Sequence, residues 1–209
     1  MVSDMAEREL EEEEMSGKRL STLGPRGLAK TAKRRIGRRI DQLFSAEKWV
    51  ELDGVISKAL VAAPDDHWLH VRRADVWYEQ RRYRKAATLY RKVLELMPGC
   101  PLGRWGLASA QMALGAHPEA RRLFQSLARE KPEVLGARDC GEGVRWARGV
   151  VADANFRLGQ LAEREGSKVV ARRRYRAYLR MVERPALSIE SRKGAQERLR
   201  ALGDRGQSR

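Results

Sequence analysis

Residues 67–100 of this chain read HWLHVRRADVWYEQRRYRKAATLYRKVLELMPGC, and residues 101–134 read PLGRWGLASAQMALGAHPEARRLFQSLAREKPEV. The two stretches are equally long, and Pro64, Pro98 and Pro132 follow one another at intervals of 34 residues. A fixed period of roughly 20 to 50 residues is typical of proteins built from stacked structural repeats. The chain is therefore expected to be a repeat protein.

Small and aromatic residues follow the same period. The matching positions are Ala74, Ala108 and Gly159 in the first half of each unit, Ala86, Ala120 and Ala171 in the second half, and Tyr90, Phe124 and Tyr175 shortly after them. Small side chains let two helices cross closely, whereas a proline ends a helix because it lacks a backbone N–H donor. The pattern indicates pairs of antiparallel helices.

This pattern resembles the tetratricopeptide repeat family, whose unit is a helix–turn–helix of about 34 residues. The resemblance covers roughly residues 33–185. It implies an all-α fold, a right-handed α-solenoid of about four helix–turn–helix repeats with a C-terminal capping helix.

Composition and register divide the chain into a tail, a stack and an end. We expect a disordered, charged N-terminal tail over 1–25, a solenoid over 26–203 and a frayed C-terminus over 203–209. Within the stack we expect repeats at about 33–66, 67–100, 101–134 and 152–185, an insertion at 135–151, and a capping helix at 188–202 with Ile189, Ala195 and Leu199 on its apolar side.

Turn residues and prolines predict the helix boundaries. The second repeat is expected to form helices over 67–80 and 83–96, and Pro132 is expected to end the second helix of the third repeat. In the insertion we expect a loop to about residue 141, followed by an unusually long helix over 142–164.

The charge balance is strongly basic. The chain carries 43 Lys and Arg residues against 28 Asp and Glu residues, a formal net charge of +15. Such an excess favours an anionic partner, which includes nucleic acid, an acidic protein segment or an anionic membrane face. A highly charged surface also keeps a protein soluble, so the composition alone leaves both interpretations open.

The family resemblance implies a binding site. First helices of successive repeats line a concave groove that holds peptide segments of other proteins, and residues at offsets of three, four and three share one helical face. The residues expected to face the groove are Trp68, Val71, Asp75 and Tyr78 in the second repeat, Leu102, Trp105, Ser109 and Met112 in the third, and Asp153, Phe156, Gln160 and Glu163 in the fourth. We expect a protein–protein interaction scaffold or adaptor.

The residue types at these positions narrow the range of ligands that the groove is expected to bind. One family subtype clamps a terminal carboxylate with lysine and asparagine, but Val71 and Trp105 stand where those residues are expected. A hydrophobic or amphipathic peptide is the better match. Trp68 and Trp105 also fit a purely structural role as half-buried packing residues.

A second candidate surface is basic. The arginines concerned are Arg172, Arg176 and Arg180 in an i, i+4 row, with Arg173 and Arg174 beside them. Arginine presents forked donors that match phosphate and carboxylate. The alternative function is therefore binding of nucleic acid or another polyanion through the basic segments 18–39 and 168–184, and a solvated outer face explains the same residues without any ligand.

Catalytic and metal-binding patterns are weak. His67 and His70 share a helix face without a third ligand in sequence, and Cys100 and Cys140 lack the spacing of metal ligands and allow at most one disulfide. No nucleophile and base pair up along the chain. We expect no metal, no cofactor and no enzymatic activity.

Targeting signals are missing from the pattern as well. The sequence holds no run of about 18 apolar residues, and its first residues are acidic rather than hydrophobic. We expect a cytoplasmic protein without a membrane span, whose partner is another protein, with self-association through the ends of the stack left open.

Overall fold

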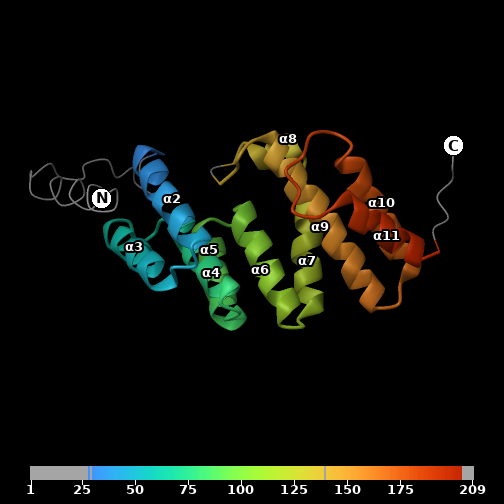
Figure 1. Ribbon diagram of the computed structural model, residues 1–209, viewed down its shortest axis with the longest axis horizontal. Helices are drawn as coiled ribbons and strands as arrows, with labels where there is room; N and C mark the ends of the chain where they lie inside the picture. The colour runs from blue at the N-terminus through green and yellow to red at the C-terminus, as the bar shows by residue number, and fades with distance from the viewer. Residues whose placement is uncertain (1–27, 29, 139, 204–209) are drawn as a thin grey trace, which may run out of the picture. The chain divides into compact units, whose positions relative to one another are not determined.

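The computed structural model describes residue 28 and residues 30–138 and 140–203. Every regular element in these ranges is an α-helix (Figure 1). The expected tail over 1–25 and all but the first residue of the expected frayed end over 203–209 lie outside the described residues. The chain divides into two compact units, residues 1–66 and residues 67–209, whereas a single stack over 26–203 remains a prediction.

The described part of the first unit is one helix pair. Helix α2 (Lys30–Ser45) and helix α3 (Trp49–Ala62) are joined by a short turn, and the rings of Phe44 and Trp49 meet edge to face at 5.4 Å across it. Ile56 is fully buried on α3. Apolar residues at helical spacing thus give this pair a buried side, as the sequence pattern indicates.

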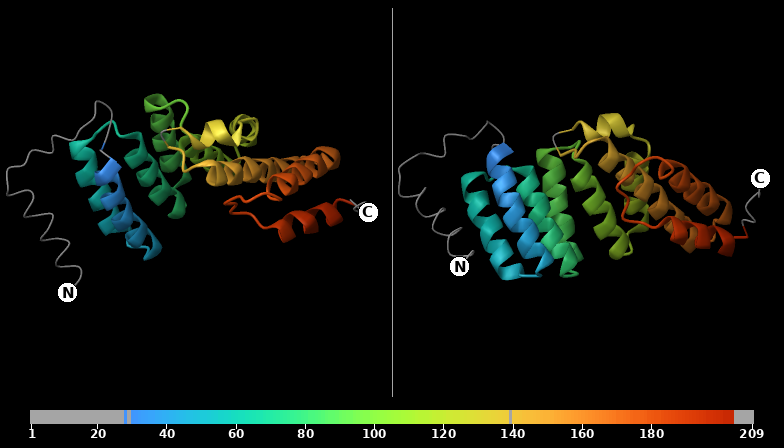
Figure 2. Two further views of the ribbon diagram at one scale, coloured as in Figure 1. Left: turned by 90° about the horizontal axis from the view of Figure 1, so that it is seen from above. Right: turned by 45° about the horizontal axis from the view of Figure 1, so that its top comes forward.

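The second unit contains the remaining helices. Its pairs are α4 (His67–Glu79) with α5 (Tyr83–Leu96), α6 (Pro101–Ala113) with α7 (His117–Ala128), and α9 (Val144–Arg164) with α10 (Lys168–Met181). Successive pairs also touch, because α5 packs on α6 and α7 packs on α9 (Figure 2). The observed bounds of α4 and α5 differ by at most one residue from the helices expected over 67–80 and 83–96.

Small residues allow the close helix crossings. Ala74 and Ala108 are completely buried at equivalent positions of α4 and α6. A Cβ atom added to Gly106 would lie 2.2 Å from the ring of Tyr90, and one added to Gly159 would lie 2.7 Å from the ring of Tyr175. Tyr90 and Tyr175 therefore fill space that larger residues in place of Gly106 and Gly159 would occupy.

The turns inside the helix pairs share one backbone geometry. Glu47, Arg81 and Gly115 have φ angles of 54°, 58° and 79°, and they are spaced by the repeat period. Gly166, with a φ of 72°, occupies the same place after the insertion. Positive φ is uncommon for non-glycine residues, so its recurrence shows that the first pair uses the same turn as the later ones.

The insertion differs in part from the expectation. Pro132 does not end a helix; α7 ends at Ala128, and Pro132 begins the short helix α8 (Pro132–Gly136). A proline is tolerated in the first turn because the N–H group it lacks has no intrahelical partner there. The long helix that follows begins at Val144 rather than at residue 142.

The C-terminal helix is shorter than expected. Helix α11 (Arg192–Ala201) begins after Ser191, whose Oγ atom accepts a hydrogen bond from the backbone N–H of Gly194 at 2.9 Å. Ile189 precedes the helix and is 71% exposed, so its expected place on the apolar side of a helix is wrong. Ala195 and Leu199 of α11 are buried in a cluster with residues of α9 and α10.

Candidate binding surfaces

Two first helices of the second unit lie in contact and present similar residues. Helices α4 and α6 touch one another directly. Besides Asp75, six of the side chains expected to face the groove are half-buried there, and we call this set of six the α4–α6 face. It consists of Trp68 and Tyr78 on α4 and Leu102, Trp105, Ser109 and Met112 on α6.

Asp75 lies between the two ends of this face on α4 and is already engaged. The hydroxyl of Tyr90 donates a hydrogen bond to Asp75 Oδ1 at 2.7 Å, and Arg72 lies 3.5 Å from Oδ2. Burial raises the pKa of Asp75, and the hydrogen bond from Tyr90 acts in the opposite direction. Asp75 therefore ties α4 to α5 in addition to any role on the surface.

The aromatic side chains of the α4–α6 face are anchored by their neighbours. The guanidinium of Arg72 lies 5.4 Å from the centre of the Trp68 ring. Trp105 meets Phe124 edge to face at 5.4 Å between ring centres. Half-buried, ordered aromatic rings offer contact area with little further loss of conformational freedom. Trp105 thus packs against a core residue and also remains partly exposed on the α4–α6 face.

Val71 is not part of this surface. It is 1% exposed and packs with Val93, Cys100 and Cys140. Cys140 belongs to the insertion, which interrupts the 34-residue period, so the pattern of the repeats could not indicate what covers Val71. The expectation that Val71 faces a groove is therefore wrong in this structure.

The corresponding residues of the fourth repeat are also covered. Phe156 is 4% exposed and lies between the rings of Tyr175 and Tyr178, at 5.2 and 5.3 Å from their centres. The guanidinium of Arg198 on α11 lies 5.8 Å from the centre of the Phe156 ring. Phe156 is therefore a core residue rather than a ligand contact.

Polar residues of α9 hold the C-terminal segment in place. The hydroxyl of Ser188 and the backbone N–H of Ile189 donate hydrogen bonds to the two carboxylate oxygens of Asp153 at 2.5 and 3.0 Å. Arg198 of α11 lies 2.6 Å from Glu163. Gln160 remains half-buried and accepts a hydrogen bond from Arg157 at 3.1 Å. Residues 185–201 thus cover much of the face that α9 was expected to offer.

The expected basic patch lies partly in one surface depression. A shallow hollow of about 540 Å³ on α10 is lined by Val169, Arg172, Arg173, Arg176 and Arg180. Arg174 is on another side of the helix, where it donates a hydrogen bond to Asn155 Oδ1 at 3.1 Å. Burial lowers the pKa of Arg174, and the neighbouring Arg173 lowers it further. Arg174 therefore does not belong with the other four arginines.

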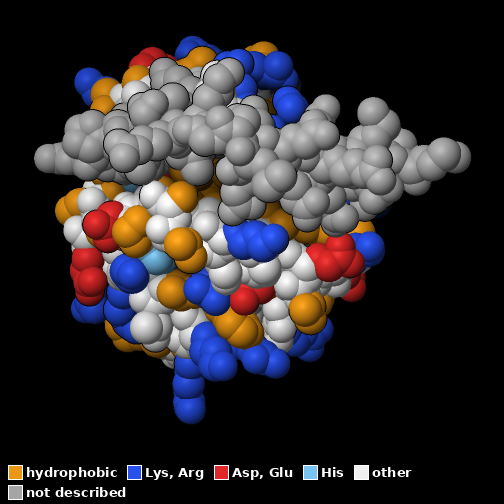
Figure 3. Space-filling model, turned by 90° about the vertical axis from the view of Figure 1, so that its left-hand side faces the viewer, with side chains coloured by type: hydrophobic (Ala, Val, Ile, Leu, Met, Phe, Trp, Pro, Cys, Tyr) orange, Lys and Arg blue, Asp and Glu red, His pale blue; other side chains and the backbone are white. Residues whose placement is uncertain are grey.

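The other basic segment, 18–39, is described only from residue 28 onward, without residue 29. Arg34 and Arg38 of α2 are exposed, whereas Lys33 lies 3.2 Å from the buried carboxylate of Asp66. Lys and Arg side chains are scattered among hydrophobic and uncharged ones on the visible part of the face in Figure 3.

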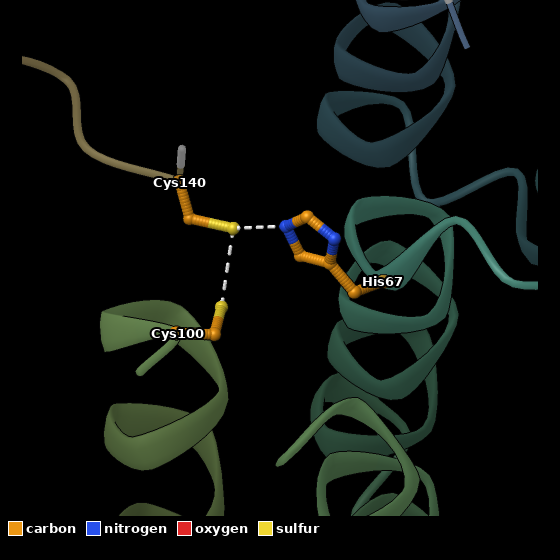
Figure 4. Close-up of side chains that lie close together, drawn as sticks. All are labelled: His67, Cys100 and Cys140. Carbon is orange, nitrogen blue, oxygen red and sulfur yellow. Dashed lines mark hydrogen bonds between the residues drawn. The ribbon is translucent and has the colours of Figure 1, made fainter. Parts of the chain in front are cut away.

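A cluster of His67, Cys100 and Cys140 was not predicted from the sequence. The Nε2 atom of His67 lies 2.7 Å from Sγ of Cys140, and the two Sγ atoms lie 3.2 Å apart (Figure 4). All three residues are buried. The sequence indicates only one of these proximities. His67 and Cys100 are almost one repeat period apart, which places them at the starts of neighbouring first helices.

The thiol of Cys100 is electrostatically unusual. Its hydrogen bond with Cys140 lowers its pKa to about 7, against the opposing effect of burial. The backbone N–H of Gly103, in the first turn of α6, also points at the sulfur at 3.4 Å. A helix start favours the thiolate because its backbone N–H groups and dipole stabilise negative charge.

Comparisons with known proteins agree with this architecture. Residues 78–137 match the profile of the tetratricopeptide repeat family. Cellulose synthase operon protein C of Xanthomonas axonopodis pv. citri (strain 306) is 31% identical over 134 residues, which cover 60% of this chain and 9% of that protein. The chain thus spans less than a tenth of the length of this curated relative.

Two solved structures share the fold. PcrH, in complex with the chaperone binding region of PopD, aligns with a TM-score of 0.51 and 17% identity over 68% of this chain and 99% of that one. MamA 41-end from Desulfovibrio magneticus RS-1 aligns with a TM-score of 0.54 and 13% identity over 74% of this chain and 77% of that one.

The repeated helix pairs and the sequence matches together define the class of protein. The match over residues 78–137 and the repeated helix pairs support a tetratricopeptide repeat protein, and the fold is the all-α helical repeat predicted from the sequence. None of the helices in the described ranges is both long enough and apolar enough to cross a membrane.

Proposed function

We propose that this protein is a non-catalytic scaffold that binds a segment of another protein on the α4–α6 face. The observation that carries the proposal is the row of half-buried aromatic and apolar side chains on two touching first helices. Aromatic anchors in partly desolvated positions contribute most of the energy at protein interfaces.

The chemistry of the face favours an apolar or amphipathic segment. Trp68, Tyr78, Trp105 and Met112 supply aromatic rings and a polarisable thioether, and Ser109 is the only hydroxyl side chain without an aromatic ring in the set. Such a surface suits the helix-in-groove mode, in which a partner places one apolar stripe in the groove. PcrH, which shares the fold, holds a region of PopD, so this architecture is compatible with segment binding.

The proposed binding surface is short. At α9 the equivalent residues Asp153 and Phe156 are covered by the C-terminal segment. A partner is therefore expected to contact α4 and α6 and to stop before α9.

A steric block on the face tests the proposal. Ser109→Arg places a long charged side chain among the apolar contacts, whereas Thr88→Arg adds the same charge at an exposed position of α5. Affinity capture with wild type and both variants side by side identifies candidate partners. The dissociation constant of each purified candidate is then measured by calorimetry.

We expect Ser109→Arg to weaken binding at least about tenfold, which corresponds to roughly 1.4 kcal/mol. Thr88→Arg is expected to bind like wild type. Equal affinities of the two variants for every captured protein would overturn the assignment of the α4–α6 face.

The hollow on α10 supports a second candidate function, the binding of a polyanion. Four arginines line one depression, where like charges on one helix face repel one another and favour an anionic counterpart. Charge reversal of Arg173 and Arg176 is expected to reduce affinity for a nucleic-acid duplex and to flatten its salt dependence. The matched control reverses Arg84 and Lys85, which are exposed on α5; an equal effect of both double variants would point to net charge alone.

A further inference from the structure

Three metal-ligand atoms converge at one buried point of the second unit. The Nε2 or Nδ1 atom of His67 and the Sγ atoms of Cys100 and Cys140 all lie within 4.8 Å of one another. Cys100 is 1% exposed, and His67 and Cys140 are each 6% exposed. Each side chain comes from a different element: the first residue of α4, the residue before α6, and the insertion before α9 (Figure 4).

The repeat architecture explains why these residues meet. Stacked pairs place the starts of successive first helices next to one another, so residues about one period apart become neighbours. His67 and Cys100 are such a pair, whereas Cys140 reaches them only because the insertion folds back over the start of α6. Two rigid helix starts and one added segment thus form the cluster.

We propose that His67, Cys100 and Cys140 form a binding site for a thiophilic metal ion of the Zn²⁺ type. Thiolate and imidazole groups are the ligands that zinc prefers in proteins. Two thiolates and a neutral imidazole would balance the charge of a divalent ion, which a buried site favours. A zinc ion with three protein ligands completes its shell with a fourth, exogenous ligand such as water.

The distances require only a small adjustment. Tetrahedral zinc with bonds of about 2.3 Å to sulfur and about 2.0 Å to nitrogen separates its ligand atoms by roughly 3.6 to 3.8 Å. The observed separations of 2.7 Å between nitrogen and sulfur and 3.2 Å between the sulfurs are shorter. Side-chain rotations that move each donor atom by less than about 1 Å would open the cluster enough for an ion.

The surroundings suit a metal thiolate. The backbone N–H of Gly103 lies 3.4 Å from the sulfur of Cys100 at the start of α6, where backbone N–H groups stabilise negative charge on a thiolate. Val71 and Val93 pack against the cysteines and keep bulk water away from them. The hydrophobic shell around a metal site controls solvent access and the local dielectric.

A bound ion would cross-link the insertion to two repeats. It would join α4, α6 and the segment before α9, and it would stabilise the folded chain because an unfolded chain does not hold the three ligands together. The role we infer is structural: the ion fixes the segment that covers Val71 at one end of the α4–α6 face.

Metal titration of the full-length, reduced, chelator-treated chain tests the site. Zn²⁺ is added in competition with a chromogenic chelator, and Co²⁺ is added separately to record the thiolate-to-metal absorption band. The variants are Cys100→Ser, Cys140→Ser and His67→Gln. The matched control is His70→Gln, which changes another buried histidine one turn further along α4.

We expect wild type and His70→Gln to bind one equivalent of Zn²⁺ and to gain thermal stability from it. Loss of a ligand should weaken affinity by more than the 10- to 100-fold typical of changes at outer-shell residues. Circular dichroism and thermal unfolding in chelator confirm that each variant folds.

Two results would overturn the proposal. One is wild-type affinity in the ligand variants or the absence of a thiolate–Co²⁺ band, which would mark the metal as adventitious. The other is no metal binding by the reduced chain together with the loss of both thiols in the chain isolated without reductant, which would assign the pair to a Cys100–Cys140 disulfide instead.

Discussion

The α4–α7 repeats and the α9–α11 region have the same helix-pair architecture but present different surfaces. In the first region Trp68, Trp105 and Met112 stay half-buried on the first helices. In the second region Phe156, at an equivalent position, is enclosed by Tyr178 and α11. The comparison teaches that the repeat decides where helices form, and the segments outside the repeat decide which faces remain available.

The insertion has the same covering effect on α4. Cys140, which lies outside the period, packs on Val71 and Cys100. Non-repeated segments therefore cover first-helix residues in two places: the insertion covers Val71 of α4, and the C-terminal segment covers Phe156 of α9. The predictions below perturb one region and leave the other in place.

The largest effect is expected from removing the C-terminal segment. A chain ending at Arg184 loses α11 and exposes Phe156, Tyr175 and Tyr178, and burial of each such side chain contributes roughly 1.5–3 kcal/mol. We expect the free energy of unfolding to fall by at least about 3 kcal/mol, measured by denaturant unfolding. A chain ending at Gly203, which keeps α11, serves as the control and should unfold like wild type.

A smaller effect is expected where the C-terminal segment meets α9. A Cβ atom on Gly149 would lie 1.9 Å from the carbonyl oxygen of Leu187, so Gly149→Ala must displace backbone, at a cost of roughly 1–3 kcal/mol. Gly54 in α3 has open space around it, and Gly54→Ala should stabilise its helix by up to about 1 kcal/mol. If the two alanine variants had equal stability, the close approach of Leu187 to α9 would be wrong.

The smallest effect concerns the tie between α4 and α5. Tyr90→Phe removes the hydrogen bond to Asp75 and should cost roughly 1 kcal/mol. Burial raises the folded-state pKa of Asp75 above its unfolded value. Ionisation of this carboxyl group therefore lowers the free energy of unfolding, and the loss grows as the pH rises from the unfolded-state pKa through the folded-state pKa. Without the Tyr90 hydroxyl the pKa rises further, and the loss should be larger at neutral pH than near pH 4.

An Asp75→Asn background provides the check on this pH dependence. The amide does not titrate, so the cost of Tyr90→Phe in that background should be the same at both pH values. Chemical unfolding at the two pH values measures it. A pH-independent cost in the wild-type background would remove Asp75 from the explanation.

Much of the fold was predictable because it is encoded locally and repeatedly. Ala74, Ala108 and Gly159 mark close crossings, and the prolines lie at helix boundaries, so period and spacing indicate the all-α helical repeat. The sequence pattern misplaces Pro132 because a proline fits both the end of one helix and the first turn of the next.

The candidate sites were predictable only in part. Helical spacing identified Trp68 and Trp105 but not the covering of Val71 and Phe156, because burial there depends on segments with no periodic partner. The metal-ligand cluster depends on Cys140, whose position follows from how the insertion folds back. Contacts between a repeat and a non-repeated segment cannot be predicted from the periodic pattern of the sequence.

Hydroxyl-radical footprinting of the full-length chain tests the central contrast most directly. Corrected for intrinsic reactivity, Trp68, Trp105 and Met112 should be oxidised substantially faster than Phe156 and Tyr175, and Phe156 should become reactive in the chain ending at Arg184. Equal protection of the two sets, or a Phe156 that reacts as fast as Trp105 in the intact chain, would contradict the account.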